Sequence, residues 1–142
     1  MSLWRRITDW WRGRRQPRHL EIGQRGEALA RRHLEKQGLK FLLANYQARR
    51  GEIDLVMRCE DCLVFVEVKT RAAGGWTRPA AAVNRRKRQI LSRTALHYVR
   101  SLRNPYVKIR FDIVEVLLNK DNTVEIRHLP NTFNLSPPYQ FG

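Results

Sequence analysis

The sequence predicts one α/β domain in which helices pack on a mixed β-sheet. Apolar residues recur at helical spacing in two segments, and in five others they alternate or run continuously, as they do in strands. In chain order these segments read α-β-β-β-α-β-β. A hairpin meander followed by a helical crossover gives antiparallel and parallel strand pairs in one sheet. The length of 142 residues suits a single domain with a modest core.

Two segments are predicted to be amphipathic helices. Residues 20–37 carry an apolar stripe at a spacing of about 3.6 residues, and Gly38 is expected to end this helix. A second helix is expected to begin at Asn84 or a neighbour and to run to about Leu102. The Asn-Pro pair at 104–105 is expected to stop it.

The remaining apolar segments are predicted to be strands, at residues 40–46, 52–58, 62–70, 107–118 and 123–129. The second and third of these strands lie close enough in sequence to form a hairpin centred on Glu60 and Asp61. Residues 120–122, Lys-Asp-Asn, predict a turn between the last two strands.

The predicted domain covers residues 19–130 and has a segment of different character at each end. Residues 1–18 form a basic arm that is rich in Trp and Arg, and Pro17 separates it from the first helix. Such an arm is suited to contact phosphates or to lie on an anionic membrane surface, and the alternative is that it does neither. Residues 131–142 are expected to be an irregular tail.

The formal net charge of +15 is the strongest global signal. A basic excess of this size is typical of proteins that bind polyanions, most often nucleic acid, and the alternative is a solvated basic surface. The charge is unevenly distributed. Residues 51–70 contain 2 basic and 5 acidic side chains, whereas residues 71–110 contain 11 basic ones and no acidic one. A small acidic segment therefore adjoins a strongly basic one.

Cysteine content and hydropathy indicate the compartment. No apolar run reaches the roughly 18 residues of a membrane span, and the N-terminus lacks the apolar region of a secretory signal. Cys59 and Cys62 have C-x-x-C spacing, but a structural zinc site needs four ligands and no second pair occurs. We interpret them as thiols paired across the hairpin. Two cysteines without an export signal predict a cytoplasmic protein.

The most apolar strand, LVFVEVKTR at residues 63–71, contains two charged side chains. Because side chains alternate along a strand, Glu67 and Lys69 point to the same face as Phe65. A symmetric hairpin turn places Asp54 opposite Glu67, with their Cβ atoms about 4.5–5.5 Å apart. Two adjacent carboxylates repel each other unless a cation lies between them. The alternative is an ordinary ion pair at a sheet edge.

A hard divalent cation, Mg²⁺ or Mn²⁺, is expected to neutralise Asp54 and Glu67. Mg²⁺ takes oxygen ligands and commonly uses one or two carboxylates, and the backbone carbonyl of Val68 is a further candidate ligand. A metal ion held there activates water and neutralises charge on a phosphodiester. Lys69 is expected to position that water or to stabilise the transition state electrostatically.

Two helical residues are candidates for the same site. Glu27 lies at the border of the first helix's apolar stripe, where it either reaches the sheet or faces solvent. Lys87 falls within the apolar stripe of the second helix, so we expect it to meet an anion, either a phosphate or the acidic site, unless it extends to solvent. The nearby candidates for phosphate contacts are Arg71, Arg85, Arg86 and Arg88.

The stretches GQRGEALA, RRGEIDLV, LVFVEVKTR and AAAVNRRKRQI resemble the YraN-type family of small endonuclease-like proteins. The set Asp54, Glu67, Lys69 also resembles the PD-(D/E)xK signature of the restriction endonuclease-like superfamily. The resemblance covers about residues 20–118. It implies an αβββαβ core, a divalent metal and phosphodiester hydrolysis, with Glu27, Asp54, Glu67 and Lys69 in the active site. The chain departs from the family's pattern at residues 80–82, where alanines replace an acidic residue.

These observations predict a metal-dependent endonuclease that binds nucleic acid, DNA in preference to RNA, with branched structures among its substrates. The alternative is a non-catalytic nucleic-acid-binding module on a nuclease fold. A third hypothesis gives the arm at residues 1–18 a role at a membrane surface or in protein interaction. The assembly is left open, with a homodimer among the alternatives.

Overall fold

The computed structural model describes residues 18–72, 83–103 and 107–135. The predicted basic arm up to residue 17, the alanines at 80–82, the Asn-Pro pair at 104–105 and the end of the predicted tail lie outside these residues.

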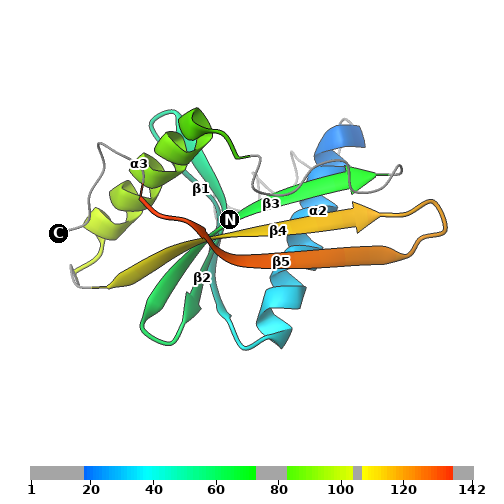
Figure 1. The fold of residues 1–142 in the computed structure, drawn as a ribbon, viewed down its shortest axis with the longest axis horizontal. Helices are drawn as coiled ribbons and strands as arrows, with labels where there is room; N and C mark the ends of the chain where they lie inside the picture. The colour runs from blue at the N-terminus through cyan, green and yellow to red at the C-terminus, as the bar shows by residue number, and fades with distance from the viewer. Residues whose placement is uncertain (1–17, 73–82, 104–106, 136–142) are drawn as a thin grey trace, which may run out of the picture.

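Within the described residues the chain forms two helices and five strands (Figure 1). The elements are α2 (Arg18–Lys36), β1 (Lys40–Ala48), β2 (Gly51–Cys59), β3 (Cys62–Ala72), α3 (Arg85–Ser101), β4 (Lys108–Leu118) and β5 (Val124–Phe133). This order confirms the predicted α/β class. The run from α2 to β4 has the αβββαβ order of a restriction endonuclease-like core, and β5 is added at its end.

The strands form one mixed sheet in the order β1-β2-β3-β4-β5. The pairs β1–β2, β2–β3 and β4–β5 are antiparallel, as expected of neighbours joined by short turns. The pair β3–β4 is parallel, because α3 carries the chain back along the sheet between them. The crossover therefore follows directly after the strand that carries Glu67 and Lys69.

The two helices cover opposite faces of the sheet. Ala30 and Leu34 of α2 pack with residues such as Val66, whereas Leu91 and Ala95 of α3 belong to a second core with Phe65 and Ile113. In Figure 1, α2 crosses β3 and β4, while α3 lies toward β1 and β2. The alternation predicted for β3 is confirmed, since the face of Phe65 meets α3 and the face of Val66 meets α2.

The helix boundaries follow from local chemistry. Gly38 has a φ of 95°, and the bonds Gly38 N–H to Glu35 O (3.0 Å) and Leu39 N–H to Leu34 O (3.1 Å) close α2 in a Schellman motif. Asn84 caps α3, because its side-chain oxygen accepts the backbone N–H of Lys87 at 2.9 Å.

The irregular tail begins later than the sequence suggested. Asn131, with a φ of 50°, donates its backbone N–H to Oδ1 of Asp112 at 2.9 Å. Beyond this irregularity Phe133 pairs with Phe111, and their rings stack with centroids 4.6 Å apart. The expectation of an irregular chain from residue 131 onward is therefore wrong for residues 131–133.

Candidate active site

The β2–β3 hairpin keeps the predicted register over the half that is nearest its turn. The paired residues run from Cys59↔Cys62, which are free thiols facing each other across the turn, to Leu55↔Val66. The register stops one step before the expected pair of Asp54 and Glu67. Instead, the backbone N–H of Val68 donates to Oδ2 of Asp54 at 2.8 Å. The two strands separate here, and a carboxylate side chain bridges the gap.

An irregularity in β1 lies beside this separation. Asn45 has a φ of 54° and falls opposite Asp54, between the pairs Ala44↔Leu55 and Tyr46↔Ile53. Strict alternation is broken there, because Ile53 and Val56 both pack on the α3 side. The break turns Asp54 away from α3 and toward α2.

Asp54 consequently shares a pocket with Glu27. The pocket has a volume of about 370 Å³ and lies between α2, β2 and β3, where its lining includes Glu27, Asp54, Val68 and Thr70. The structure thus decides the question left open for Glu27. This side chain reaches the sheet, and α2 supplies a carboxylate to the hollow in which β2 and β3 separate.

Close approach of the backbone of α2 brings Glu27 to this position. A Cβ atom at Gly26 would overlap the Thr70 side chain of β3, so no other residue allows α2 to lie this near the sheet. At Gly23, one turn earlier, a Cβ atom would meet nothing within 4 Å. The glycine next to Glu27 therefore has a packing role that the other one lacks.

The pKa of Asp54 reflects burial first and the neighbouring carboxylates second. Burial and the negative charge of Glu67 raise this pKa from 3.8 to about 8, although the Val68 N–H opposes the shift. Glu27 and Glu52 raise it further. Within the described part of the chain, no cation contributes to the shift. The metal-free protein therefore holds the Asp54 proton to a higher pH than an ordinary carboxyl group does.

Glu27 responds to the same surroundings. Its pKa is raised by burial, and the charges of Glu52 and Glu67 add to the effect, while a hydrogen bond from Asn45 opposes it. In the orientation that its neighbours require, the Asn45 amide donates to Oε1 of Glu52 at 3.0 Å and to Oε2 of Glu27 at 3.2 Å. One amide group therefore holds together two carboxylates from different elements.

Sequence reasoning missed both Asn45 and Glu52. Glu52 belongs to the acidic segment that the charge distribution had already marked. The signal for Asn45 was an asparagine inside an apolar strand. Among residues other than glycine, Asn is one of those that best tolerate the left-handed backbone.

Glu67 faces the other helix. Its Oε1 lies 3.3 Å from Nζ of Lys87, which α3 presents in its first turn. Lys87 therefore contacts an acid of the candidate site, one of the two kinds of anion predicted as its partner. The Glu67 side chain is only 13% exposed and that of Lys87 is 45% exposed, so the lysine side chain remains open to a solvent-borne anion.

Lys69 lies two residues further along β3, on the same face as Glu67. In the parallel register it is opposite Glu115 of β4, whose side chain is almost completely buried. The sequence had given no role to Glu115. An acidic residue in an apolar strand could have marked Glu115 as a candidate. The parallel register places it opposite Lys69.

Asp112 provides an internal comparison for Asp54. It is more completely buried than Asp54, yet it accepts two hydrogen bonds from Arg110 (3.0 and 3.1 Å) and one each from His128 Nε2 (2.7 Å) and the backbone N–H of Asn131. Burial alone would raise the pKa of Asp112, but these donors together lower it. Asp112 is therefore stabilised as a structural anion, and Asp54 is not.

The candidate phosphate-binding arginines fall into two groups. Arg85 and Arg86 are exposed in the first turn of α3, beside Lys87. Arg88 is engaged internally, because its Nε donates to the carbonyl of Val83 at 2.8 Å and its guanidinium lies 5.8 Å from the Phe133 ring centroid. Arg71 is half-buried near the end of β3.

Comparison with known proteins assigns the family. The family described as "Uncharacterised protein family UPF0102" matches residues 26–116. The chain belongs to this family. A UPF0102 protein of Trichlorobacter lovleyi is 38% identical over 116 residues, which cover 81% of this chain and 91% of the relative. One of Syntrophomonas wolfei is 41% identical over 113 residues, covering 80% and 97%. UPF0102 is the YraN-type group, so the resemblance is confirmed.

The UPF0102 match contains every residue of the predicted catalytic set, from Glu27 to Lys69, and Lys87 as well. The basic arm lies outside the match. In the described part of this UPF0102 chain, no helix is both long and apolar enough to cross a membrane.

The carboxylates of this UPF0102 protein are suitable ligands for a hard cation, but they do not form a complete coordination site in advance. Among the described residues, no three His, Cys, Asp or Glu side chains are grouped closely enough to hold a metal ion. Mg²⁺ does not require such a group, since it commonly uses one or two carboxylates and completes its shell with water and substrate phosphate. The unneutralised Asp54 fits an oxygen-preferring cation.

Proposed function

We propose that this UPF0102 protein is a metal-dependent nuclease that hydrolyses phosphodiester bonds, with DNA favoured over RNA. The observation that carries the proposal is the placement of Asp54 and Glu27 in one pocket between α2, β2 and β3, where burial and the neighbouring carboxylates raise the pKa of Asp54. A buried acid surrounded by other acids destabilises a fold, and such arrangements are concentrated at functional sites. The well-neutralised Asp112 shows that this chain builds purely structural acids differently.

Asp54 and Glu67 face different helices, but the charge of Glu67 acts on Asp54 across the gap between β2 and β3. At this gap the two carboxylates and the carbonyl of Val68 would hold Mg²⁺ or Mn²⁺, with Glu27 as an additional ligand or an acceptor for bound water. When bound, such an ion supplies charge neutralisation at the phosphate and a more acidic water. The 2.8 Å bond from the Val68 N–H fixes Asp54 at the gap between the strands, which supports a ligand role.

The lysines have separate roles in this proposal. Lys69 would hold the attacking water or the negative charge that develops on the phosphate. Lys87 neutralises Glu67 in the metal-free protein at 3.3 Å and, once a metal takes over that charge, would turn to the substrate phosphate. Hydrolysis itself adds one water across one P–O bond and gives a phosphate monoester and a hydroxyl.

The charge of the chain supports nucleic acid as the substrate. The net charge is +15, and Arg85 and Arg86 lie exposed beside Lys87 at the start of α3. Phosphate contacts of this kind give affinity without sequence readout, so a structural feature such as a flap or branch is the proposed basis of selectivity.

A non-catalytic nucleic-acid-binding module is the second candidate. The observation in its favour is that no three potential ligands are grouped among the described residues. Calorimetric titration with Mn²⁺ separates the two candidates, because only the nuclease requires the ion to bind. Intact nucleic-acid binding without Mn²⁺ binding would favour the module.

The direct test is hydrolysis of labelled single-stranded, duplex, flap and four-way-junction DNA with Mg²⁺ or Mn²⁺. The wild-type protein is compared with Glu67→Ala and Asp54→Ala, and with Asp61→Asn as a control from the exposed hairpin turn. We expect metal-dependent cleavage by the wild type and the control only. Equal cleavage by all four proteins would identify a contaminating nuclease and remove the proposal.

A further inference from the structure

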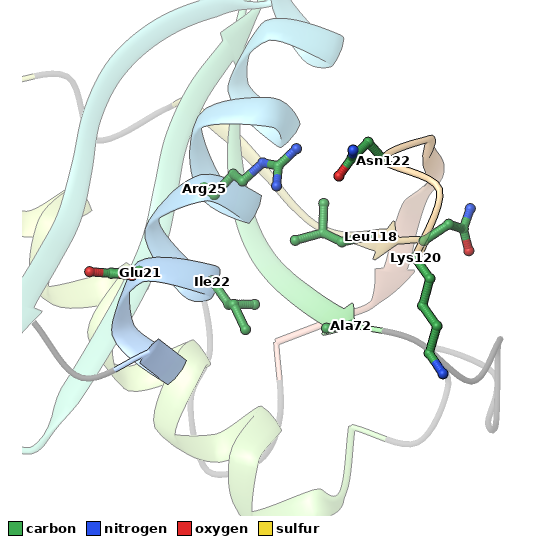
Figure 2. A pocket seen from close by; sticks show the side chains of 8 residues that line it. Glu21, Ile22, Arg25, Ala72, Leu118, Lys120 and Asn122 are labelled. Atoms are coloured by element: carbon green, nitrogen blue, oxygen red, sulfur yellow. The ribbon is translucent and has the colours of Figure 1, made fainter.

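A second pocket lies beside the candidate active site and has no part in the chemistry described so far. It has a volume of about 470 Å³ and is formed by the first turns of α2, the end of β3 and the turn between β4 and β5 (Figure 2). Two of its lining residues, Ile22 and Ala72, also line the pocket of Glu27 and Asp54. The two hollows are therefore direct neighbours.

The lining of this pocket combines apolar and cationic groups. Ile22, Ala72 and Leu118 provide apolar surface, and Ile22 and Leu118 belong to the core on the α2 side of the sheet. Arg25 extends toward Asn122, and the Lys120 side chain runs past Ala72 (Figure 2). The one acid in the lining, Glu21, points to the other side of α2 in this view.

The wall formed by the β4–β5 turn is held in a fixed shape. Asn119 N–H donates to Thr123 O at 2.9 Å, and the Asn119 side-chain amide donates to Oγ1 of Thr123 at 3.0 Å. Asp121 accepts both the backbone N–H and the hydroxyl of Thr123. Asn122 takes a φ of 67° at the end of this turn, which places its side chain in the lining of the pocket.

These groups match the parts of a nucleotide. An apolar floor accepts the face of a base, and an asparagine amide offers both a donor and an acceptor to a base edge. Two cations at opposite ends of the pocket suit the phosphates on either side of the nucleotide. A base enters such a pocket only after leaving the stack of a duplex, which requires a single strand or a flap.

We infer that the pocket of Arg25, Lys120 and Asn122 binds one nucleotide of a single strand, next to the phosphodiester at Glu27 and Asp54. The inference rests on the proposed nuclease function and names its substrate class. Arg25 and Lys120 lie at opposite ends of the pocket (Figure 2), so they contact the phosphates on either side of this nucleotide, and Ile22 and Leu118 contact the base. Single-stranded tails and flaps are then the favoured substrates, because a continuous duplex offers no free base.

The test is a binding measurement that needs no catalysis. Fluorescence anisotropy of a short, fluorescein-labelled single-stranded oligothymidylate is followed in EDTA, where hydrolysis is blocked. Arg25→Ala/Lys120→Ala is expected to weaken binding at least about tenfold, the ratio that corresponds to 1.4 kcal/mol. The matched control is Lys40→Ala/Arg100→Ala, which removes two exposed cations of β1 and α3. We expect less than about a twofold change there.

Replacing the amide of Asn122 by a carboxylate tests the pocket without removing a cation. Asn122→Asp keeps the size of the side chain and tolerates the left-handed backbone, but it adds a negative charge beside Arg25. We expect it to weaken binding of the oligothymidylate as well. Thermal unfolding of each variant verifies that the fold is intact.

Three outcomes would overturn the inference. Equal losses in the pocket and control variants would show general electrostatic attraction only. If Arg25→Ala/Lys120→Ala weakened binding of a duplex probe as much as binding of the single strand, the pocket would hold a backbone phosphate rather than a base. Competition by free thymidine monophosphate as strong as that by the oligonucleotide would indicate a small-molecule site. Because the measurement excludes metal, its result is independent of whether the protein cleaves DNA.

Discussion

The backbone N–H of Val68 donates to Oδ2 of Asp54 across the gap where β2 and β3 separate, at 2.8 Å. The Asp54 side chain here accepts a backbone N–H that would otherwise be available to continue the ladder. The bond favours the charged form of Asp54, yet burial and the neighbouring acids outweigh it and hold the pKa at about 8. The metal-free fold is therefore strained electrostatically at this residue.

This strain predicts a stabilising substitution. The folded protein holds the Asp54 proton up to a pH of about 8, whereas the unfolded chain releases it near 3.8. Stability is thus lost as pH rises between these values. In EDTA, Asp54→Asn should raise the free energy of unfolding at pH 8 by at least about 1 kcal/mol, since one pKa unit corresponds to 1.36 kcal/mol. The gain should vanish near pH 4.

Urea unfolding at both pH values measures this effect. Asp61→Asn serves as the control, because Asp61 is 71% exposed and pairs with Lys108. A gain for Asp54→Asn that is the same at pH 4 and pH 8 would contradict the raised pKa.

Metal binding should depend on pH for the same reason. Mn²⁺ binds the ionised carboxylate, so binding must displace the Asp54 proton at any pH below about 8. The association constant measured by calorimetry should rise by up to about tenfold per pH unit between pH 6 and 8. Heat measured in buffers of different ionisation enthalpy should reveal the released proton. A flat profile would exclude Asp54 as a ligand.

Lys87 and the metal should compete for Glu67. The ammonium lies 3.3 Å from the carboxylate and is partly exposed, so the ion pair contributes no more than about 1 kcal/mol. Lys87→Ala should therefore tighten Mn²⁺ binding by up to about fivefold while it slows cleavage. Arg86→Ala, one residue away and exposed, should leave Mn²⁺ affinity unchanged. Weaker Mn²⁺ binding in Lys87→Ala would contradict this role.

Two glycines of α2 should respond in opposite ways to the same substitution. Gly23→Ala adds a methyl group in open space within a helix and should stabilise the protein by about 0.5–1 kcal/mol. Gly26→Ala forces a methyl group into the Thr70 side chain and should destabilise it by about 1–3 kcal/mol. Because Glu27 follows directly, Mn²⁺ affinity should fall only for Gly26→Ala. Urea unfolding and calorimetry measure the two effects.

Much of the fold was predictable because local patterns determine it. The cap residues Gly38 and Asn84 act within one turn of their helices, so their effect is visible in a short stretch of sequence. The same holds for the alternation that assigns Phe65 and Val66 to opposite faces of β3. A two-residue turn also fixed the hairpin register as far as Leu55.

The predicted pairing of β2 with β3 is wrong at Asp54, and the irregular residue beside it lies in a different strand, β1. The alternation of both β1 and β2 is broken beside the left-handed backbone of Asn45, and no pattern within β2 shows it. The same distance in sequence concealed the role of the Asn45 amide between Glu27 and Glu52. Glu115 stayed unassigned because only the parallel register of β4 places it opposite Lys69.

The sequence by itself determined which residues carry charge inside the apolar elements, and so it named Glu27, Asp54, Glu67, Lys69 and Lys87. Only the tertiary structure decided how they are grouped. It placed Asp54 with Glu27 on the α2 side and Glu67 with Lys87 of α3. The physical reason is that charges act through space across strands and helices. The approach of α2 at Gly26 and the separation of β2 from β3 set those distances.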